Sequence, residues 1–159
     1  MRIEKTDPHV ANSVKSYRDI GYTFEIAIAD IIDNSISAKS SSISVIATES
    51  PKMFIGILDN GIGMNDDELK EAMRLSTKDP DMLRDEDDLG KFGLGLKTAS
   101  FSHCKKLTVA SKSKNNKIYV KQWDIANIIK SNSWDLNILD ESDVSKLIIE
   151  ADCSDLFDQ

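Results

Sequence analysis

The chain has 159 residues, is 40% hydrophobic and carries a formal net charge of −7. It is long enough for one domain with a sizeable core and too short for two ordinary domains. The acidic balance, with no basic stripe, gives no sign that this segment binds nucleic acid. No apolar run approaches a membrane span, the N-terminus lacks the apolar core of a signal peptide, and two isolated cysteines suit a reducing compartment. We therefore expect a cytoplasmic domain.

Apolar periodicity and turn residues predict helices and strands in alternation along the chain. Helices are predicted over residues 8–20, 23–38 and 65–74, over the end of a glycine-rich segment at 90–103, and over 125–130. Strands are predicted over residues 42–48, 52–58, 106–112, 117–123 and 134–139. The first two strands, separated by a short turn at Ser50 and Pro51, are typical of an antiparallel hairpin. No element is predicted after residue 139.

The second helix is apolar, but it carries polar side chains on one face. Thr23 can cap its N-terminus, and its apolar side consists of Ile28, Ile31, Ile32 and Ile36. Asp30 and Asn34 are four residues apart and share another face, where they need a partner such as a metal, water or ligand. A carboxamide oxygen suits Mg²⁺ that bridges phosphates, and Asp30 could accept a proton from an attacking water. The alternative is a solvated helix end.

The segment Asp59-Asn-Gly-Ile-Gly-Met64 follows the second predicted strand. Gly61 and Gly63 permit a tight backbone path that a flat ligand can approach closely. We expect Asp59 to be buried, and a carboxylate only accepts hydrogen bonds, so it suits a ligand amino group. Adenine offers such an amine where guanine has an acceptor oxygen, so this arrangement would select adenine. An ordinary Asp-Asn-Gly turn is the alternative.

A third motif reads Gly90-x-x-Gly93-x-Gly95-x-Lys97-Thr98. Glycines that lead into a helix N-terminus expose backbone N–H groups to phosphate, and Lys97 could add a point charge. The spacing is neither a P-loop nor the dinucleotide fingerprint, because Leu96 separates the last glycine from the lysine and the glycine order is reversed. A flexible loop is the alternative. Residues 75–89 are polar and rich in acids, and we expect a mobile loop there.

The order of these three motifs resembles the GHKL ATPase family, which includes gyrase B, MutL, MORC proteins, a heat-shock chaperone and sensor histidine kinases. The resemblance covers about residues 22–123, and the wording of residues 27–34 is most similar to MORC-like and MutL-like members. It implies an α+β fold, a two-layer sandwich with helices on one face of a mixed, mostly antiparallel sheet (the Bergerat fold). Residues 1–159 would form a single such domain, an N-terminal fragment of a longer protein whose partner domains follow it.

The resemblance also implies the ligands, ATP and Mg²⁺, and a role for each site residue. Asp30 would be the catalytic base, Asn34 the magnesium ligand and Asp59 the adenine-reading acid. The turn beside the base would consist of Gly61, Gly63 and Met64. Residues 75–89 would be the ATP lid, with phosphate contacts from Ser76, Thr77 and Lys78. The phosphate box would consist of Gly90, Lys91, Phe92, Gly93, Leu94, Gly95, Lys97 and Thr98.

Two departures from the family pattern leave alternatives open. The hydrolysing branch usually has Glu where Asp30 stands, and the late Gly-Thr strand of the family has no match after Thr98. The first hypothesis is a slow Mg²⁺-dependent ATPase with ATP-driven homodimerisation. The second is an ATP-binding switch that does not hydrolyse. The third is a histidine kinase catalytic domain, against which stands the lack of an upstream phosphoacceptor helix pair.

Overall fold

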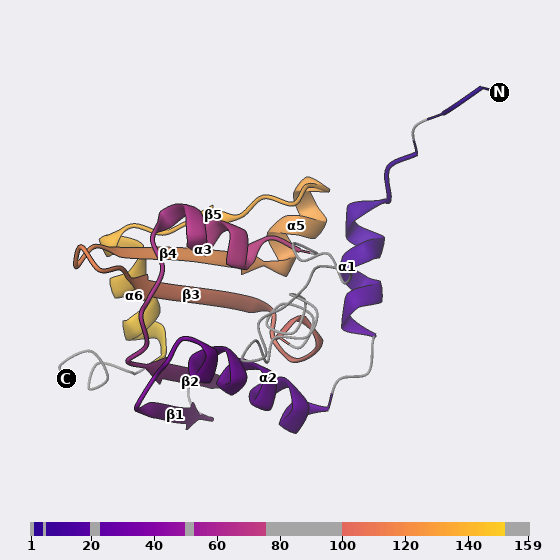
Figure 1. Ribbon diagram of the computed structural model, residues 1–159. Coiled ribbons are helices and arrows are strands. Elements are labelled where there is room, and N and C mark those ends of the chain that lie inside the picture. The colour runs from indigo at the N-terminus through magenta and orange to yellow at the C-terminus, as the bar shows by residue number, and fades with distance from the viewer. Residues whose placement is uncertain (1, 5, 20–22, 50–52, 76–99, 152–159) are drawn as a thin grey trace.

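The structure, a computed structural model, describes residues 2–4, 6–19, 23–49, 53–75 and 100–151 (Figure 1). Its helices are α1 (Val10–Arg18), α2 (Phe24–Ser37), α3 (Asp66–Met73), α5 (Ile125–Ser131) and α6 (Glu141–Ala151), and residues 100–103 are also helical. Its strands are β1 (Ile43–Thr48), β2 (Phe54–Asp59), β3 (Lys106–Lys112), β4 (Ile118–Asp124) and β5 (Asn137–Ile138). The predicted mixture of helices and antiparallel strands is confirmed.

The described strands form two antiparallel sheets, where the sequence led us to expect one. β1 and β2 form a hairpin in which Val45 lies opposite Ile57. The other sheet has the order β3-β4-β5, with Val109 opposite Lys121. Figure 1 shows α2 beside the hairpin, while α1, α3 and α5 lie beside the three-stranded sheet. Among the described residues, no backbone pairing joins the two sheets.

The core lies where α1, α3 and α5 meet one face of β4. Its buried members are Val14, Leu69, Met73, Phe101, Trp123, Ile125 and Ile128. Trp123 is 4% exposed, donates its indole N–H to the carbonyl of Met73 at 2.9 Å, and meets Trp134 edge to face at 6.1 Å. Burying each such side chain contributes about 1.5–3 kcal/mol, so this cluster dominates the stability of the domain. Both tryptophans thus pack in or against this core.

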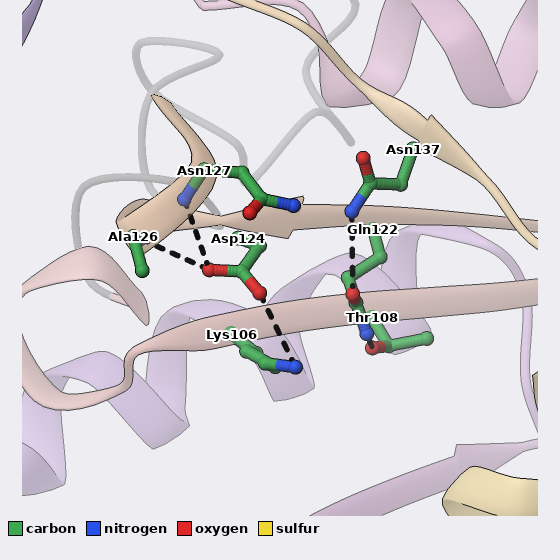
Figure 2. A network of polar contacts seen from close by, with 7 residues as sticks. All are labelled: Lys106, Thr108, Gln122, Asp124, Ala126, Asn127 and Asn137. Atoms are coloured by element: carbon green, nitrogen blue, oxygen red, sulfur yellow. Dashed lines mark hydrogen bonds and ion pairs between the residues drawn. The ribbon is translucent and has the colours of Figure 1, made fainter. Parts of the chain in front are cut away.

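Polar contacts fix the ends of the helices. Thr23 caps α2 by accepting from the N–H of Ile26, and Asn65 forms a capping box with Glu68 at the start of α3. Asp124, at the end of β4, caps α5 by accepting from Ala126 and Asn127, and its other oxygen lies 3.2 Å from the ammonium of Lys106 (Figure 2). These caps satisfy N–H groups that a helix cannot pair internally.

A polar ladder crosses the three-stranded sheet on its other face. Figure 2 shows Gln122 of β4 between Thr108 and Asn137. Its amide donates to the Thr108 hydroxyl at 2.8 Å, and its oxygen accepts from Asn137 at 3.5 Å. The ladder joins neighbouring strands through side chains as well as through the backbone.

Several predicted boundaries were wrong. The first helix begins at Val10, because His9 has an extended backbone, and it ends at Arg18. Gly21, which follows the predicted end of this helix, and the predicted turn at Ser50 and Pro51 lie outside the described residues. The last strand shortens from 134–139 to Asn137–Ile138, which lie opposite Gln122 and Lys121 of β4. Helix α6 was missed, although Val144, Leu147, Ile148 and Ala151 recur in it at a helical spacing. Within the described ranges no helix is long and apolar enough to cross a bilayer.

Candidate functional site

The carboxylate of Asp59 ends β2 and is hydrogen-bonded on both oxygens. One oxygen accepts from the hydroxyl of Ser35 at 3.0 Å, and the other accepts from the N–H of Gly61 at 2.8 Å. Ser35 lies on α2 and is 4% exposed, whereas Asp59 is exposed. The expectation of a buried Asp59 was therefore wrong: its strand ends at the rim of a two-stranded hairpin. Each oxygen keeps one further lone pair for a donor from outside.

The turn after Asp59 is tied to the C-terminal end of α2. The side-chain oxygen of Asn60 accepts from the backbone N–H groups of Ser41 and Ser42, each at 2.9 Å. The N–H of Ile62 donates to the carbonyl of Ala38 at 3.0 Å. These bonds fix the first half of the turn against the helix that carries Asp30 and Asn34.

Both glycines of the turn lie where a side chain would collide. A Cβ on Gly61 would lie 2.8 Å from the Cβ of Ala38. Gly63 has a φ of +65°, and a Cβ there would lie 1.9 Å from the carbonyl oxygen of Lys112. The N–H of Met64 then donates to the hydroxyl of Ser111 at 2.8 Å. The two glycines thus allow the tight backbone path that was predicted, and the space that their side chains would fill is taken by Ala38 at the end of α2 and by Lys112 of β3.

Asp30 and Asn34 lie one turn apart on α2. The amide nitrogen of Asn34 donates to the backbone carbonyl of Asp30 at 2.9 Å. This leaves the carboxamide oxygen of Asn34, an exposed residue, as the atom that can bind a ligand. Partial burial, and secondly the negative charge of Asp33, raise the pKa of Asp30 above its usual range. An exposed carboxamide oxygen on a fixed helix fits the kind of ligand that Mg²⁺ takes.

The structure brings together two of the three motifs. Ser35 follows Asn34 directly in α2, and its bond to Asp59 joins the helix with the polar face to the glycine turn. The third motif and the predicted phosphate contacts before it lie outside the described residues: Ser76, Thr77, Lys78, Gly90, Lys91, Phe92, Gly93, Leu94, Gly95, Lys97 and Thr98.

The helical segment that follows the third motif is described from Ser100 onward. Phe101 is fully buried in the core. The guanidinium of Arg18, at the end of α1, donates to the carbonyls of Phe101 and Cys104 at 2.9 and 2.8 Å. A cation at the carbonyl end of a helix is favourable, so α1 anchors this segment.

A cavity borders the turn on the side of the sheet, and Asp59 is not among the residues that line it. It has a volume of about 300 Å³, and its lining consists of Ile62, Gly63, Asn65, Glu68, Ser113, Lys114 and Asn115. Neither Asp30 nor Asn34 lines it either, so this cavity is separate from the polar groups that the two described motifs bring together. Among the described residues, no three acidic, histidine or cysteine side chains gather as metal ligands.

Sequence reasoning missed Ser35 and Ser111. Ser35 lies four residues after Ile31 and eight after Ala27, so its inward position on α2 could have been found from the helical period. Ser111 gave no such signal, because its partner, the N–H of Met64, lies 47 residues away in sequence.

Comparison with known proteins agrees with this geometry. The family described as "Histidine kinase-, DNA gyrase B-, and HSP90-like ATPase" matches residues 22–154. Over 90 residues, 55% of this chain, the sequence is 39% identical to the putative MutL protein homolog 1 of Schizosaccharomyces pombe (strain 972 / ATCC 24843). The matched part spans 13% of that protein. The chain therefore belongs to the histidine kinase-, DNA gyrase B- and HSP90-like (GHKL) ATPase family, and it is an ATP-binding domain similar to MutL.

Proposed function

We propose that this domain binds ATP with Mg²⁺, reads the adenine base through Asp59, and hydrolyses ATP slowly with Asp30 as the general base. The observation that carries the proposal is the hydrogen bond from Ser35 to Asp59. It holds the helix with Asp30 and Asn34 against the end of β2. The acceptor for the adenine base, Asp59, and the polar groups that would face the phosphates, Asp30 and Asn34, then belong to one site.

Adenine recognition by Asp59 is supported by the lone pairs that its two oxygens retain. Its exposure leaves these oxygens accessible to the exocyclic amine of the base. Guanine would present an oxygen to the same carboxylate, and two acceptors repel. Asp59 would therefore select ATP over GTP.

The phosphate end would be bound by three parts of the chain. GHKL ATPases bind ATP with Mg²⁺, and the exposed oxygen of Asn34 would hold the ion, which offsets the phosphate charge. The glycines and Lys97 of the third motif, with Ser76, Thr77 and Lys78, would donate to the phosphate oxygens. We propose on sequence grounds that residues 75–89 close over the phosphates and that ATP-bound domains dimerise. On the same grounds we propose that the helices cover one face of a two-layer sandwich.

Slow hydrolysis follows from the chemistry of Asp30. Its raised pKa makes it a better proton acceptor at neutral pH. However, aspartate is one methylene shorter than glutamate, so its carboxylate stands about 1.5 Å further back, and a misplacement of about 1 Å can cost on the order of 100-fold in rate. Aspartate at position 30, where the hydrolysing branch of the family usually has glutamate, also favours the second candidate function, an ATP-binding switch that does not hydrolyse.

Titration calorimetry with Mg²⁺ and ATP tests the binding site. Asp59→Asn should abolish detectable binding, because the amide can present a donor to the adenine amine. Asp67→Asn is the matched control, since Asp67 is an exposed carboxylate in the first turn of α3. Wild-type affinity in Asp59→Asn would refute adenine reading by this residue.

Single-turnover hydrolysis separates the two candidate functions. Asp30→Asn should leave ATP affinity nearly unchanged and remove turnover, whereas Asp30→Glu should keep binding and raise turnover where the pocket accommodates the longer side chain. Turnover that Asp30→Asn does not change would show that this carboxylate is not the base, and the switch would become the better account.

A further inference from the structure

One face of the β3–β4 pair carries two buried polar side chains among apolar ones. Alternate residues of a strand share a face, and on this face Leu107, Val109 and Trp123 pack in or against the core. Ser111 is 8% exposed and Lys121 only 2% exposed, and both lie on the same face. A buried polar group is costly unless it is paired, so the partners of these two side chains indicate why they are there.

Both side chains bind the same short segment, the end of the glycine turn. The hydroxyl of Ser111 accepts from the N–H of Met64 at 2.8 Å. The ammonium of Lys121 lies 2.6 Å from the carboxylate of Asp66, the first residue of α3. Between these contacts and Asp59, Gly63 rests against the carbonyl of Lys112. The sheet therefore holds the end of the turn, while α2 holds its beginning.

We infer that Ser111 and Lys121 are positioning residues for the adenine-reading turn, which they hold in its binding-competent place without touching ATP. This inference rests on the proposed function. Without the Ser111 hydroxyl, the N–H of Met64 loses its acceptor and the end of the turn is free to move away from the sheet. If the competent position is then only partly populated, the apparent affinity for ATP falls by the same fraction.

The ion pair offers a test with little effect on folding. The side chain of Asp66 is 49% exposed, so water can solvate its charge when Lys121 is replaced. Methionine fills a similar volume in the apolar face, and removing one partner of an ion pair is strongly destabilising only where the remaining charge stays buried. Lys121→Met should therefore release the turn from the sheet in a domain that stays folded.

The experiment measures ATP affinity by calorimetry and unfolding by urea for Ser111→Ala, Lys121→Met and a matched control. The control is Ser113→Ala: Ser113 is also 8% exposed, but within the described part of the chain its hydroxyl is hydrogen-bonded to Asn115 and Lys117 of its own hairpin. We expect Ser111→Ala to bind ATP about tenfold more weakly, Lys121→Met severalfold more weakly, and Ser113→Ala like the wild type. Ser111→Thr, which keeps the hydroxyl, should restore affinity.

The outcomes distinguish this inference from the function on which it rests. Unchanged affinity in both Ser111→Ala and Lys121→Met, with binding lost in Asp59→Asn, would overturn the inference and leave adenine reading intact. Equal weakening in Ser113→Ala would also overturn it, because general destabilisation would then explain the effect. Wild-type binding by Asp59→Asn would instead remove the proposed function, and the positioning role with it.

Discussion

Replacing Gly63 by alanine tests the contact between the glycine turn and strand β3. The residue has a φ of +65°, where an L side chain costs about 1–2 kcal/mol. In addition, the new Cβ would lie 1.9 Å from the carbonyl oxygen of Lys112, so backbone must shift. Such overpacking costs about 1–3 kcal/mol, and we expect Gly63→Ala to lower the free energy of unfolding by about 3 kcal/mol in total.

Thermal and urea unfolding, followed by the fluorescence of Trp123 and Trp134, measure this loss. A loss of about 3 kcal/mol lowers the melting temperature by about 10 °C in a domain of this size. Gly56→Ala is the control: among the described residues, a Cβ there meets the ring of Phe54 at 3.0 Å, and that side chain can turn away. A change below about 0.5 kcal/mol in Gly63→Ala, within the usual range for surface substitutions, would refute the close approach of the turn to β3.

Three further substitutions test other parts of the account. Asn65→Ala should lower the free energy of unfolding by about 1 kcal/mol in urea titrations, because it removes the capping box of α3. Trp123→Phe should lower it by about 1–3 kcal/mol, because the buried carbonyl of Met73 loses its donor; an equally stable variant would contradict that hydrogen bond. The raised pKa of Asp30 means that the native state binds this proton more tightly than the unfolded chain, so the ionised carboxylate lowers stability at neutral pH. Asp30→Asn should therefore melt above the wild type at pH 7, and the difference should vanish below about pH 3.9, the ordinary pKa of aspartate.

The sequence was sufficient for elements whose signals are local. The cap at Thr23 and the strand β3 were predicted correctly, because capping and alternation are read from neighbouring residues. Helix α2 was predicted in extent but not in packing. Its apolar side is only partly covered, and Ile36 remains 47% exposed, since burial depends on what the rest of the chain places against the helix.

The site shows the same division between local and distant contacts. The tight backbone path at Gly61 and Gly63 followed from the pattern of glycines, which is local, whereas its contacts with Ala38 and Lys112 did not. The exposure of Asp59 and the anchoring of the turn by Ser111 and Lys121 did not, because they depend on where β2 ends and on strands that come about 50 residues later.

The central claim is that Asp59 makes this domain an adenine-specific ATP site, and the most direct measurement compares ATP and GTP. Calorimetric titration of the protein with each nucleotide in Mg²⁺ should show binding of ATP and a preference over GTP of roughly 10⁴-fold, because a site built around one acceptor rejects a base that lacks the matching donor. Equal affinity for the two nucleotides would contradict the claim.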